Sequence, residues 1–409
     1  MKGHLMKYTL IVLLSVMGLT SCDNNGSEQD SSKNVEQQVT TVSVLCQQRN
    51  AASGIDLNED NNDDDTAPII IDSFKDGSKL YFSQMGPTQT PNFLDQSEGA
   101  SPYLYIYEYN QNENATWEDG YNFSVWEDRK PLDWTTVKNV GSVGNAFSLY
   151  AMYFPDNEVK FKVAQDQRGG EEDQYDKTNF MKSDIMGAYH ATSSLYTRLR
   201  FRLFHLMAYL KVTLYVPDYE DELSDDNTES SYSGFKKGAL KEAFVINAYT
   251  DFNIEWRANR SSDTEAPLVQ AIGNKTKISM YRHNSDETKI IEDFNVKDYY
   301  TGNDLTTDRV RAYHFSVLFP SQSFGNDYFL CFTLKTPEGA MKYYYCSGSQ
   351  IMGDGGNFNL TQGTLQHLSL YLPRKTNETI LVGANILPWS DAVTDMTVTQ
   401  QPSSNGNNN

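Results

Sequence analysis

"RLRFRLFHLMAYLKVTLYV", residues 198–216, decides the fold, because it contains neither Gly nor Pro and its apolar residues change phase in the middle. Before the change they occupy odd positions, Leu199, Phe201 and Leu203. After it they occupy even positions, Phe204, Leu206, Ala208, Leu210, Val212, Leu214 and Val216. Alternation with a period of two predicts a β-strand, and a shift of one residue moves every side chain to the other face. We therefore predict a long bent strand that changes sheet near Leu203 and Phe204, at the junction between two domains.

His205 stands beside this predicted bend, on the polar or mixed face that it shares with Lys211 and Thr213. A histidine in such a place either forms a structural hydrogen bond or serves as a ligand or base. No other histidine of the chain stands at a spacing used for metal ligands on one helix or turn. We therefore predict a structural histidine, hydrogen-bonded across the junction.

The rest of the chain is rich in strand-forming residues, with 26 Tyr and 20 Phe. Short aromatic or alternating segments bounded by turn residues occur at 40–46, 79–84, 103–109, 121–126, 146–155, 243–256, 313–320, 328–334, 341–346 and 365–373. Many short strands without helical periodicity between them predict antiparallel β-sandwiches. The length of 409 residues is sufficient for two ordinary domains.

The first residues form a targeting segment rather than part of the fold. Lys2 and Lys7 accompany an apolar run at residues 8–19, which is too short to span a bilayer comfortably. The next residues, "LTSC", resemble the lipobox of bacterial lipoproteins, in which a signal peptidase cuts before a lipid-bearing cysteine. This resemblance implies a signal peptide over residues 1–21 and lipidation of Cys22. An ordinary secretory signal, with an incidental Cys22, is the alternative.

The cysteines of the predicted folded region do not form a disulfide framework. Cys331 and Cys346 flank a predicted hairpin turn at "TPEG", residues 336–339. With Pro337 and Glu338 as the central residues, Cys331 would face Tyr344, so the two cysteines would be diagonal neighbours. We therefore predict free thiols.

No motif for a catalytic triad, a phosphate-binding loop, a dinucleotide site or a zinc site is present in the sequence. The net charge of −20 argues against nucleic acid or anionic lipid as a partner. The acidic loop at residues 56–66 begins like a calcium-binding loop but lacks the central Gly and the final Glu. We therefore predict a protein without catalytic residues, metal or cofactor, although a carboxylate pair for glycoside hydrolysis stays open as an alternative.

Several stretches together resemble the fimbrillin-like surface lipoproteins of Bacteroidales, within the clan of major and minor fimbrial subunits. They are "AFSLYAMYFP", "NFMKSDIMGAYH", "FRLFHLMAYLKVTL", "YHFSVLFPSQSF" and "LSLYLPRKTNETILVGANILPW", at residues 146–155, 179–190, 201–214, 313–324 and 368–389. The resemblance implies an all-β chain with two tandem transthyretin-like sandwich domains of Greek-key type. We place a flexible tether at 22–38, the domains at 39–197 and 198–400, and a disordered tail at 401–409.

The resemblance also implies a mode of assembly. A protease cuts behind the first strand, the strand leaves, and an extended segment of another subunit fills the vacated position. Arg49 is the only Arg or Lys between Lys33 and Lys75, so we place the cut between Arg49 and Asn50. Ala392, Met396 and Val398 share one face of a candidate donor strand, although this segment could instead be the last strand of the second domain.

The implied function is that of a structural or accessory fimbrial subunit at the outer membrane, which serves adhesion and has other subunits as partners. Such subunits form a head-to-tail polymer. The alternative is a surface lipoprotein that never polymerises and binds a glycan or host protein. Retention of lipidated Cys22 on the mature chain would indicate the alternative, whereas a new N-terminus at Asn50 would indicate a polymerised subunit.

Overall fold

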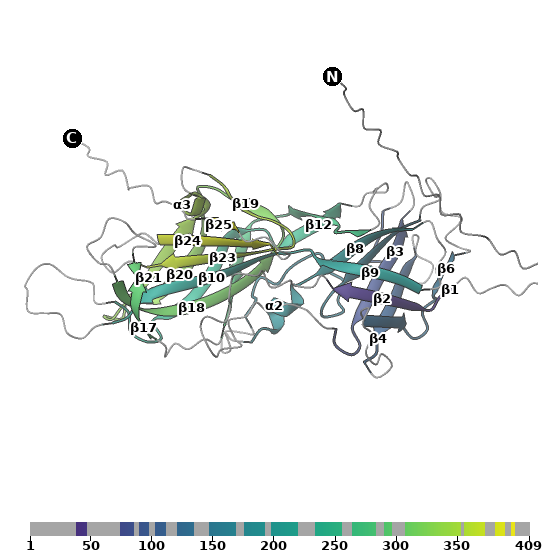
Figure 1. Cartoon of the computed structure of the whole chain (residues 1–409), viewed down its shortest axis with the longest axis horizontal. Coiled ribbons are helices and arrows are strands. Elements are labelled where there is room, and N and C mark those ends of the chain that lie inside the picture. The colour runs from purple at the N-terminus through teal and green to yellow at the C-terminus, as the bar shows by residue number, and fades with distance from the viewer. Residues whose placement is uncertain are drawn as a thin grey trace, which may run out of the picture. The chain divides into compact units, whose positions relative to one another are not determined.

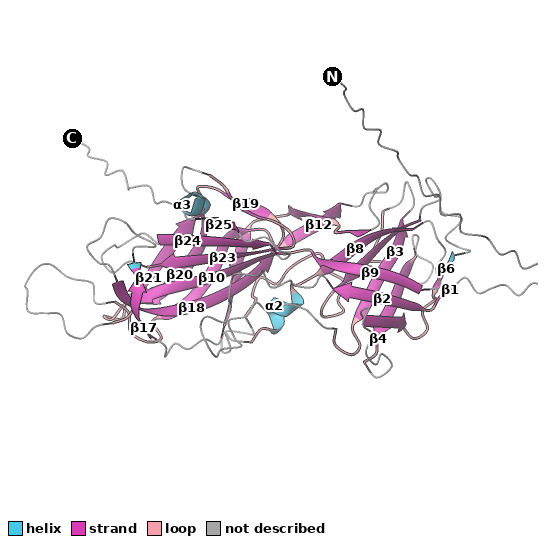
Figure 2. Ribbon diagram, viewed as in Figure 1, coloured by secondary structure: helices cyan, strands magenta, loops and turns pink. Residues whose placement is uncertain are grey.

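The computed structural model describes residues 38–46, 74–85, 90–97, 103–111, 121–134, 147–168, 176–192, 198–219, 234–255, 264–283, 290–296, 307–352, 356–372, 381–388 and 394–396. Strands dominate these residues, as Figure 2 shows, and the helices α2 (Thr178–Lys182) and α3 (Gly348–Met352) are short. The predicted all-β class is confirmed. No helix in the described part of the chain is long and apolar enough to cross a bilayer. The predicted signal peptide and the acidic loop at 56–66 lie outside the described residues.

The first half of the chain supplies most of an eight-stranded sheet, counted over the described residues. Its strands are β2 (Thr41–Cys46), β3 (Lys79–Met85), β4 (Leu104–Tyr109), β5 (Tyr121–Val125), β7 (Phe147–Tyr153), β8 (Met186–Thr192), β9 (Arg198–His205) and β13 (Thr264–Glu265). They run in the order β13-β8-β7-β3-β4-β5-β2-β9. An additional pairing sets Met186 of β8 opposite His205 of β9. The strands from β8 round to β9 therefore close into a ring, which we call the closed sheet.

Side chains at alternate positions fill the inside of the closed sheet, as the pleat requires. The buried cluster takes Val42 and Val44 from β2, and Leu199, Phe201 and Leu203 from β9. Large aromatic members of the same cluster are Phe82, Tyr105, Tyr107, Tyr109, Phe123 and Tyr153. Closure leaves β2 and β9 paired on both sides, so neither presents a free edge.

The second half of the chain supplies two further sheets over its described residues. A seven-stranded sheet contains β10 (Ala208–Pro217), β16 (Tyr281–Arg282), β17 (Ile290–Asn295), β18 (Thr307–Phe319), β23 (Thr364–Tyr371), β24 (Leu381–Pro388) and β25 (Thr394–Met396). A four-stranded sheet contains β11 (Leu240–Ala248), β15 (Thr276–Ser279), β20 (Tyr328–Lys335) and β21 (Met341–Ser347). The rings of Phe315 and Phe332, one from each sheet, lie 5.9 Å apart in a shared buried core.

Three short two-stranded pairings complete the described topology. They join β1 (Gln38–Val39) to β6 (Leu132–Asp133), β12 (Asp251–Glu255) to β14 (Leu268–Ile272), and β19 (Gln322–Phe324) to β22 (Phe358–Leu360). The single strand predicted at 243–256 is therefore wrong, because β11 ends at Ala248 and β12 begins at Asp251 in another sheet. Asn247, the residue before the end of β11, has a left-handed φ of 58°, and the pairing of β11 with β15 shifts register between Val245 and Ala248. The tandem sandwich domains and their boundaries remain predictions.

The opening stretch changes sheet, as its phase shift predicts. β9 belongs to the closed sheet and β10 to the seven-stranded sheet, where it lies between β18 and β23 (Figure 1). The change falls at Leu206 and Met207, slightly beyond the predicted position, because Phe204 still pairs with Gly187 of β8. Both junction residues are fully buried. The Leu206 N–H donates to Ile185 O at 3.0 Å, and the Met207 carbonyl accepts from the Gly363 N–H at 3.1 Å.

His205 is buried and hydrogen-bonded, as expected of a structural histidine, but its partner lies just before β8 of the same closed sheet and not across the junction. The Nδ1 of His205 lies 2.8 Å from Oδ1 of Asp184, which is itself buried. The polar or mixed face that Lys211 and Thr213 share is buried, because these residues are only 5% and 1% exposed. β10 is a central strand with neighbours on both edges, and both of its faces are covered.

The cysteines of the β20–β21 hairpin are free thiols, as predicted, and both are buried. The predicted register is wrong by one residue, because Cys331 faces Tyr345 rather than Tyr344. The turn uses Gly339 with a φ of 97°, a conformation that glycine adopts readily, and this adds one residue to the connection. Burial raises the pKa of the Cys346 thiol to about 12, so this thiol stays protonated at neutral pH.

Replacement of Leu206 with Ala tests the junction. The variant leaves a cavity at a fully buried site, so we expect the free energy of unfolding to fall by about 2–5 kcal/mol. Arg202→Ala, at an exposed position of the same stretch, is the control and should change it by less than about 0.5 kcal/mol. Urea unfolding followed by tryptophan fluorescence measures both values. If Leu206→Ala unfolds with the same free energy as the wild type, Leu206 is not packed at the junction as described.

Candidate functional site

The first long strand, β2, lies in a slot between two strands that come from distant parts of the sequence (Figure 1). On one side it pairs antiparallel with β5, with Thr41 opposite Ser124 and Val44 opposite Tyr121. On the other side it pairs parallel with β9, with Thr41 opposite Arg198 and Cys46 opposite Leu203. An extended segment placed here forms backbone hydrogen bonds along both edges.

Alternate side chains of β2 hold the strand in this slot. Val42 and Val44 are 0% exposed and point into the core of the closed sheet. Between them, Ser43 is also buried, and its Oγ donates a hydrogen bond of 2.8 Å to Oδ1 of Asn122 on β5. Burial of each Val contributes about 1.5–3 kcal/mol relative to exposure. The slot therefore selects an extended segment with small apolar residues at every second position.

A buried tyrosine holds the segment that precedes β2. The Tyr107 O–H donates to the carbonyl of Val39, and the same oxygen accepts the Leu132 N–H at 3.2 Å. These contacts lie where β1 pairs with β6, with Val39 opposite Leu132. Burial raises the pKa of Tyr107, so the phenol stays protonated and available as a donor. Tyr107 thus connects the strand β4 to both short strands.

The predicted processing residues lie outside the described part of the chain: Cys22, Arg49 and Asn50. The described strand β2 ends at Cys46, so Arg49 follows the strand closely in the sequence. A cut between Arg49 and Asn50 would separate β2 from the rest of the closed sheet, and the short strand β1, which precedes β2 and pairs with β6, would leave with it. The location of the cut remains a prediction.

Of the predicted donor residues, the structure describes Met396 alone, whereas Ala392 and Val398 lie outside it. Met396 is the last residue of β25 and lies opposite Ala384 of β24. β25 is short and stands at the end of the strand order of the seven-stranded sheet. Its position agrees with the alternative interpretation, a last strand of that sheet, and leaves a donor role as a prediction.

A polar strip that sequence reasoning missed crosses the face of the seven-stranded sheet. The Thr213 hydroxyl lies 3.0 Å from Nδ1 of His314 and 2.8 Å from Nε2 of His367, and Nε2 of His283 lies 2.6 Å from Oγ of Ser316. The neighbouring strands β18 and β23 bring these residues together. Alternation within each strand predicts which side chains lie on the same face of the sheet. The register between strands, which brings these side chains together, is set by the tertiary structure.

The described histidines of the strip form hydrogen bonds with hydroxyl groups. No group of three or more His, Cys, Asp or Glu side chains within the described residues could hold a metal ion. Burial lowers the pKa of His367 to about 3, and the nearby Lys211 and His283 act in the same direction. His367 is therefore neutral at physiological pH and serves as a hydrogen-bonding partner in the sheet.

Comparison with known proteins yields matches of structure alone, since no protein-family model and no curated protein sequence matches the chain. A candidate cell adhesion protein from Bacteroides uniformis matches at 11% identity and a TM-score of 0.42, over 78% of this chain and 93% of the other. A second, from Bacteroides ovatus, matches at 10% identity and a TM-score of 0.39, over 88% and 98%. The tip fimbrial protein Mfa3 from Porphyromonas gingivalis matches at 10% identity and a TM-score of 0.33, over 77% and 95%.

At these TM-scores the likeness determines neither the details of the fold nor a function. Candidate cell adhesion proteins and fimbrial proteins of Bacteroidales are among the structural neighbours of the chain.

Replacement of Tyr107 with Phe tests how the slot is held. Loss of the hydroxyl leaves a buried carbonyl and a buried N–H without this partner, which costs about 1–3 kcal/mol. We expect faster hydrogen exchange in peptides that cover residues 38–46, measured by mass spectrometry. Tyr343→Phe, at a side chain that is 59% exposed, is the matched control and should leave exchange unchanged. If both variants exchange like the wild type, Tyr107 does not hold this segment.

The pKa of His367 predicts a pH dependence of stability. The folded pKa of about 3 lies below the ordinary histidine pKa of 6.5, so the unfolded chain binds the proton first as the pH falls. The contribution to stability is complete above about pH 6.5 and is lost progressively toward about pH 3, by at most about 1.4 kcal/mol per pH unit. Urea unfolding of His367→Gln, repeated at several pH values in this range, should give a free energy of unfolding that depends less steeply on pH than in the wild type. The same pH dependence in both proteins would contradict the lowered pKa of His367.

Proposed function

We propose that this chain is a structural or accessory subunit of outer-membrane fimbriae, assembled by protease-triggered strand exchange and serving adhesion. The observation that supports this proposal best is the slot of β2, which lies between β5 and β9 with buried side chains at alternate positions. The protein itself performs no catalysis in this function. Its partners are further subunits of the same fibre.

Export and anchoring follow from the N-terminal sequence. In this proposal the precursor is lipidated at Cys22 and reaches the outer membrane, and a tether at residues 22–38 leads to β2. A protease then cuts between Arg49 and Asn50, and β2 leaves together with the lipid. The two predicted sandwich domains, at 39–197 and 198–400, belong to the same proposal.

The physical basis of assembly is β-augmentation. When β2 leaves, β5 and β9 each expose an edge with unpaired N–H and C=O groups, and the positions of Val42 and Val44 become empty. An extended segment of a second subunit restores the hydrogen bonds and fills the apolar positions. We propose that the segment with Ala392, Met396 and Val398 supplies this strand. Repetition of a head-to-tail contact that does not close grows a filament.

The second candidate function is a non-polymerising surface lipoprotein that binds a glycan or host protein. It is favoured by exposed apolar side chains on the β20–β21 hairpin: Tyr328, Met341, Tyr343 and Tyr345. These four make up most of the large hydrophobic side chains that are exposed among the described residues. Clustered exposed apolar groups often mark interaction sites.

Replacement of Arg49 with Ala separates the two functions. Treatment of the purified precursor with an Arg-specific protease should give a nicked wild-type form that polymerises, as seen by size-exclusion chromatography and electron microscopy. Arg49→Ala should stay monomeric under the same treatment, because the strand is not released. Arg202→Ala, which removes an exposed arginine of β9, is the control and should polymerise like the wild type.

The mature N-terminus on cells gives an independent measurement. A new N-terminus at Asn50 supports the fimbrial subunit, whereas quantitative retention of lipidated Cys22 on a monomeric protein supports the surface binder. Equal polymerisation of Arg49→Ala and the wild type would contradict release of β2 by cleavage at this residue.

A further inference from the structure

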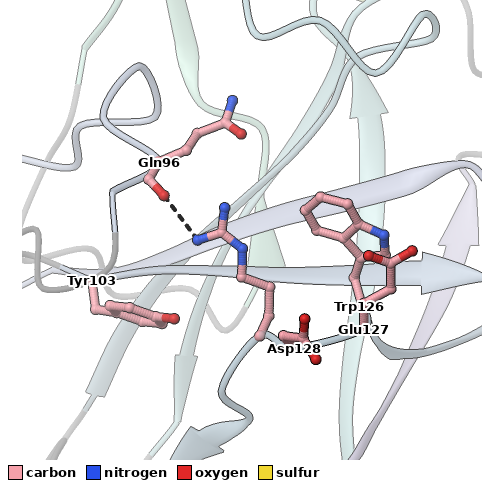
Figure 3. Close-up of a pocket in the computed structure, with 6 residues that line it drawn as sticks. Gln96, Tyr103, Trp126, Glu127 and Asp128 are labelled. Carbon is pink, nitrogen blue, oxygen red and sulfur yellow. Dashed lines mark hydrogen bonds between the residues drawn. The ribbon is translucent and has the colours of Figure 1, made fainter.

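A pocket of about 310 Å³ lies beside the turn that follows β5, and none of its described lining residues pairs with β2 (Figure 3). Its described lining consists of Gln96, Tyr103, Trp126, Glu127, Asp128 and Arg129. The volume is at the lower end of the range for small-molecule sites, about 300–1,000 Å³. None of these residues takes part in the proposed strand exchange.

A tight turn places four of the lining residues side by side. The Trp126 N–H donates to Ile106 O at 3.1 Å, which ties the start of the turn to β4, and the Arg129 N–H donates to Trp126 O at 2.9 Å. Glu127 adopts a positive φ of 38°, which is unusual for a residue with a side chain. Backbone strain of this kind costs free energy and is concentrated at functional sites.

Two cationic side chains, Arg129 and Lys79, hold the lining residues in place. The Nη1 of Arg129 donates to the carbonyl of Gln96 at 2.8 Å, as the dashed line in Figure 3 shows, so the guanidinium joins the turn to the loop that contains Gln96. The Lys79 Nζ lies 3.4 Å from the centroid of the Trp126 ring, and the Arg129 guanidinium lies 5.6 Å from it. These contacts preorganise the pocket before any ligand arrives.

Tyr103 supplies an independent observation that points to a ligand. Its hydroxyl is shielded from water and has no hydrogen-bond partner among the described residues. The ring is held by an edge contact with Tyr105 at 4.9 Å, which keeps the phenol in position. A buried hydroxyl without a partner costs free energy, and an acceptor on a bound molecule removes this cost.

The chemistry of the lining restricts the ligand class. Glu127 and Asp128 offer carboxylate acceptors, while Arg129, the Gln96 side chain and Tyr103 offer donors. Opposite charges are both present, which disfavours a simple cation or anion, and the polar rim disfavours a purely apolar ligand. A neutral sugar presents hydroxyls that both donate and accept, together with C–H groups that pack on an aromatic ring.

We propose that this pocket binds a neutral saccharide, with Tyr103 and Arg129 donating to its oxygens and Asp128 accepting from its hydroxyls.

Binding to the uncleaved chain tests this proposal without reference to polymerisation. We would titrate the wild type with methyl glycosides of neutral hexoses and N-acetylhexosamines, using saturation-transfer NMR and calorimetry, with glucuronate, glucosamine and cyclohexanol as charged and apolar probes. At least one neutral glycoside should bind, and Tyr103→Phe and Asp128→Asn should each weaken it by roughly five- to tenfold, as expected for one lost hydrogen bond.

Tyr249→Phe, an equivalent change at a partly exposed tyrosine outside both the pocket lining and the exposed cluster of the β20–β21 hairpin, is the matched control and should bind like the wild type. Thermal unfolding of each variant distinguishes lost contacts from lost structure, because Tyr103→Phe removes only a hydroxyl without a described partner and should not lower stability. The proposal is overturned if no neutral glycoside binds, if charged or apolar probes bind instead, or if both pocket variants bind with unchanged affinity.

Discussion

The closed sheet and the seven-stranded sheet both depend on how the chain passes through Leu206 and Met207, two fully buried residues between β9 and β10. A buried backbone must keep its hydrogen bonds, because an unpaired N–H or C=O group away from water is costly. Here the partners are Ile185, beside β8, and Gly363, beside β23. The same two hydrogen bonds thus fix β9 in the closed sheet and β10 in the seven-stranded sheet.

The junction also determines one wall of the candidate functional site. β9 is the parallel neighbour of β2, and it is held from its other side by β8 near Met186 and Gly187. The slot therefore has a wall that stays anchored when β2 is absent. β5 supplies the other wall and is paired to β4. This arrangement suits the proposed exchange of one strand for another, because the strands on either side keep a partner throughout.

Some buried polar groups of this structure are paired with one another, and a few have no hydrogen-bond partner among the described residues. Asp184 pairs with His205, Tyr107 with Val39 and Leu132, and Thr213 with His314 and His367, and these contacts hold the strands in register. The hydroxyls of Tyr103 and Thr333 and the amide oxygen of Gln366 are shielded and have no such partner, and of these three residues Tyr103 lines the pocket beside Trp126. Its place in that pocket is why we assign a ligand to Tyr103 and structural roles to the paired groups.

Local patterns determined a good part of this description. Alternation of apolar residues gave the strands and the all-β class, the phase shift within residues 198–216 gave the change of sheet, and the spacing of Cys331 and Cys346 gave free thiols. These features depend on the period at which apolar residues recur along the sequence and on turn geometry, and both are properties of residues close together in the sequence. The closing of the first sheet, the partners of β2, the burial of Lys211 and the pocket beside Trp126 were decided by the tertiary structure alone. Each of them depends on which strands pair and in what register, and pairing between distant segments is set by the packing of the whole core rather than by any local pattern.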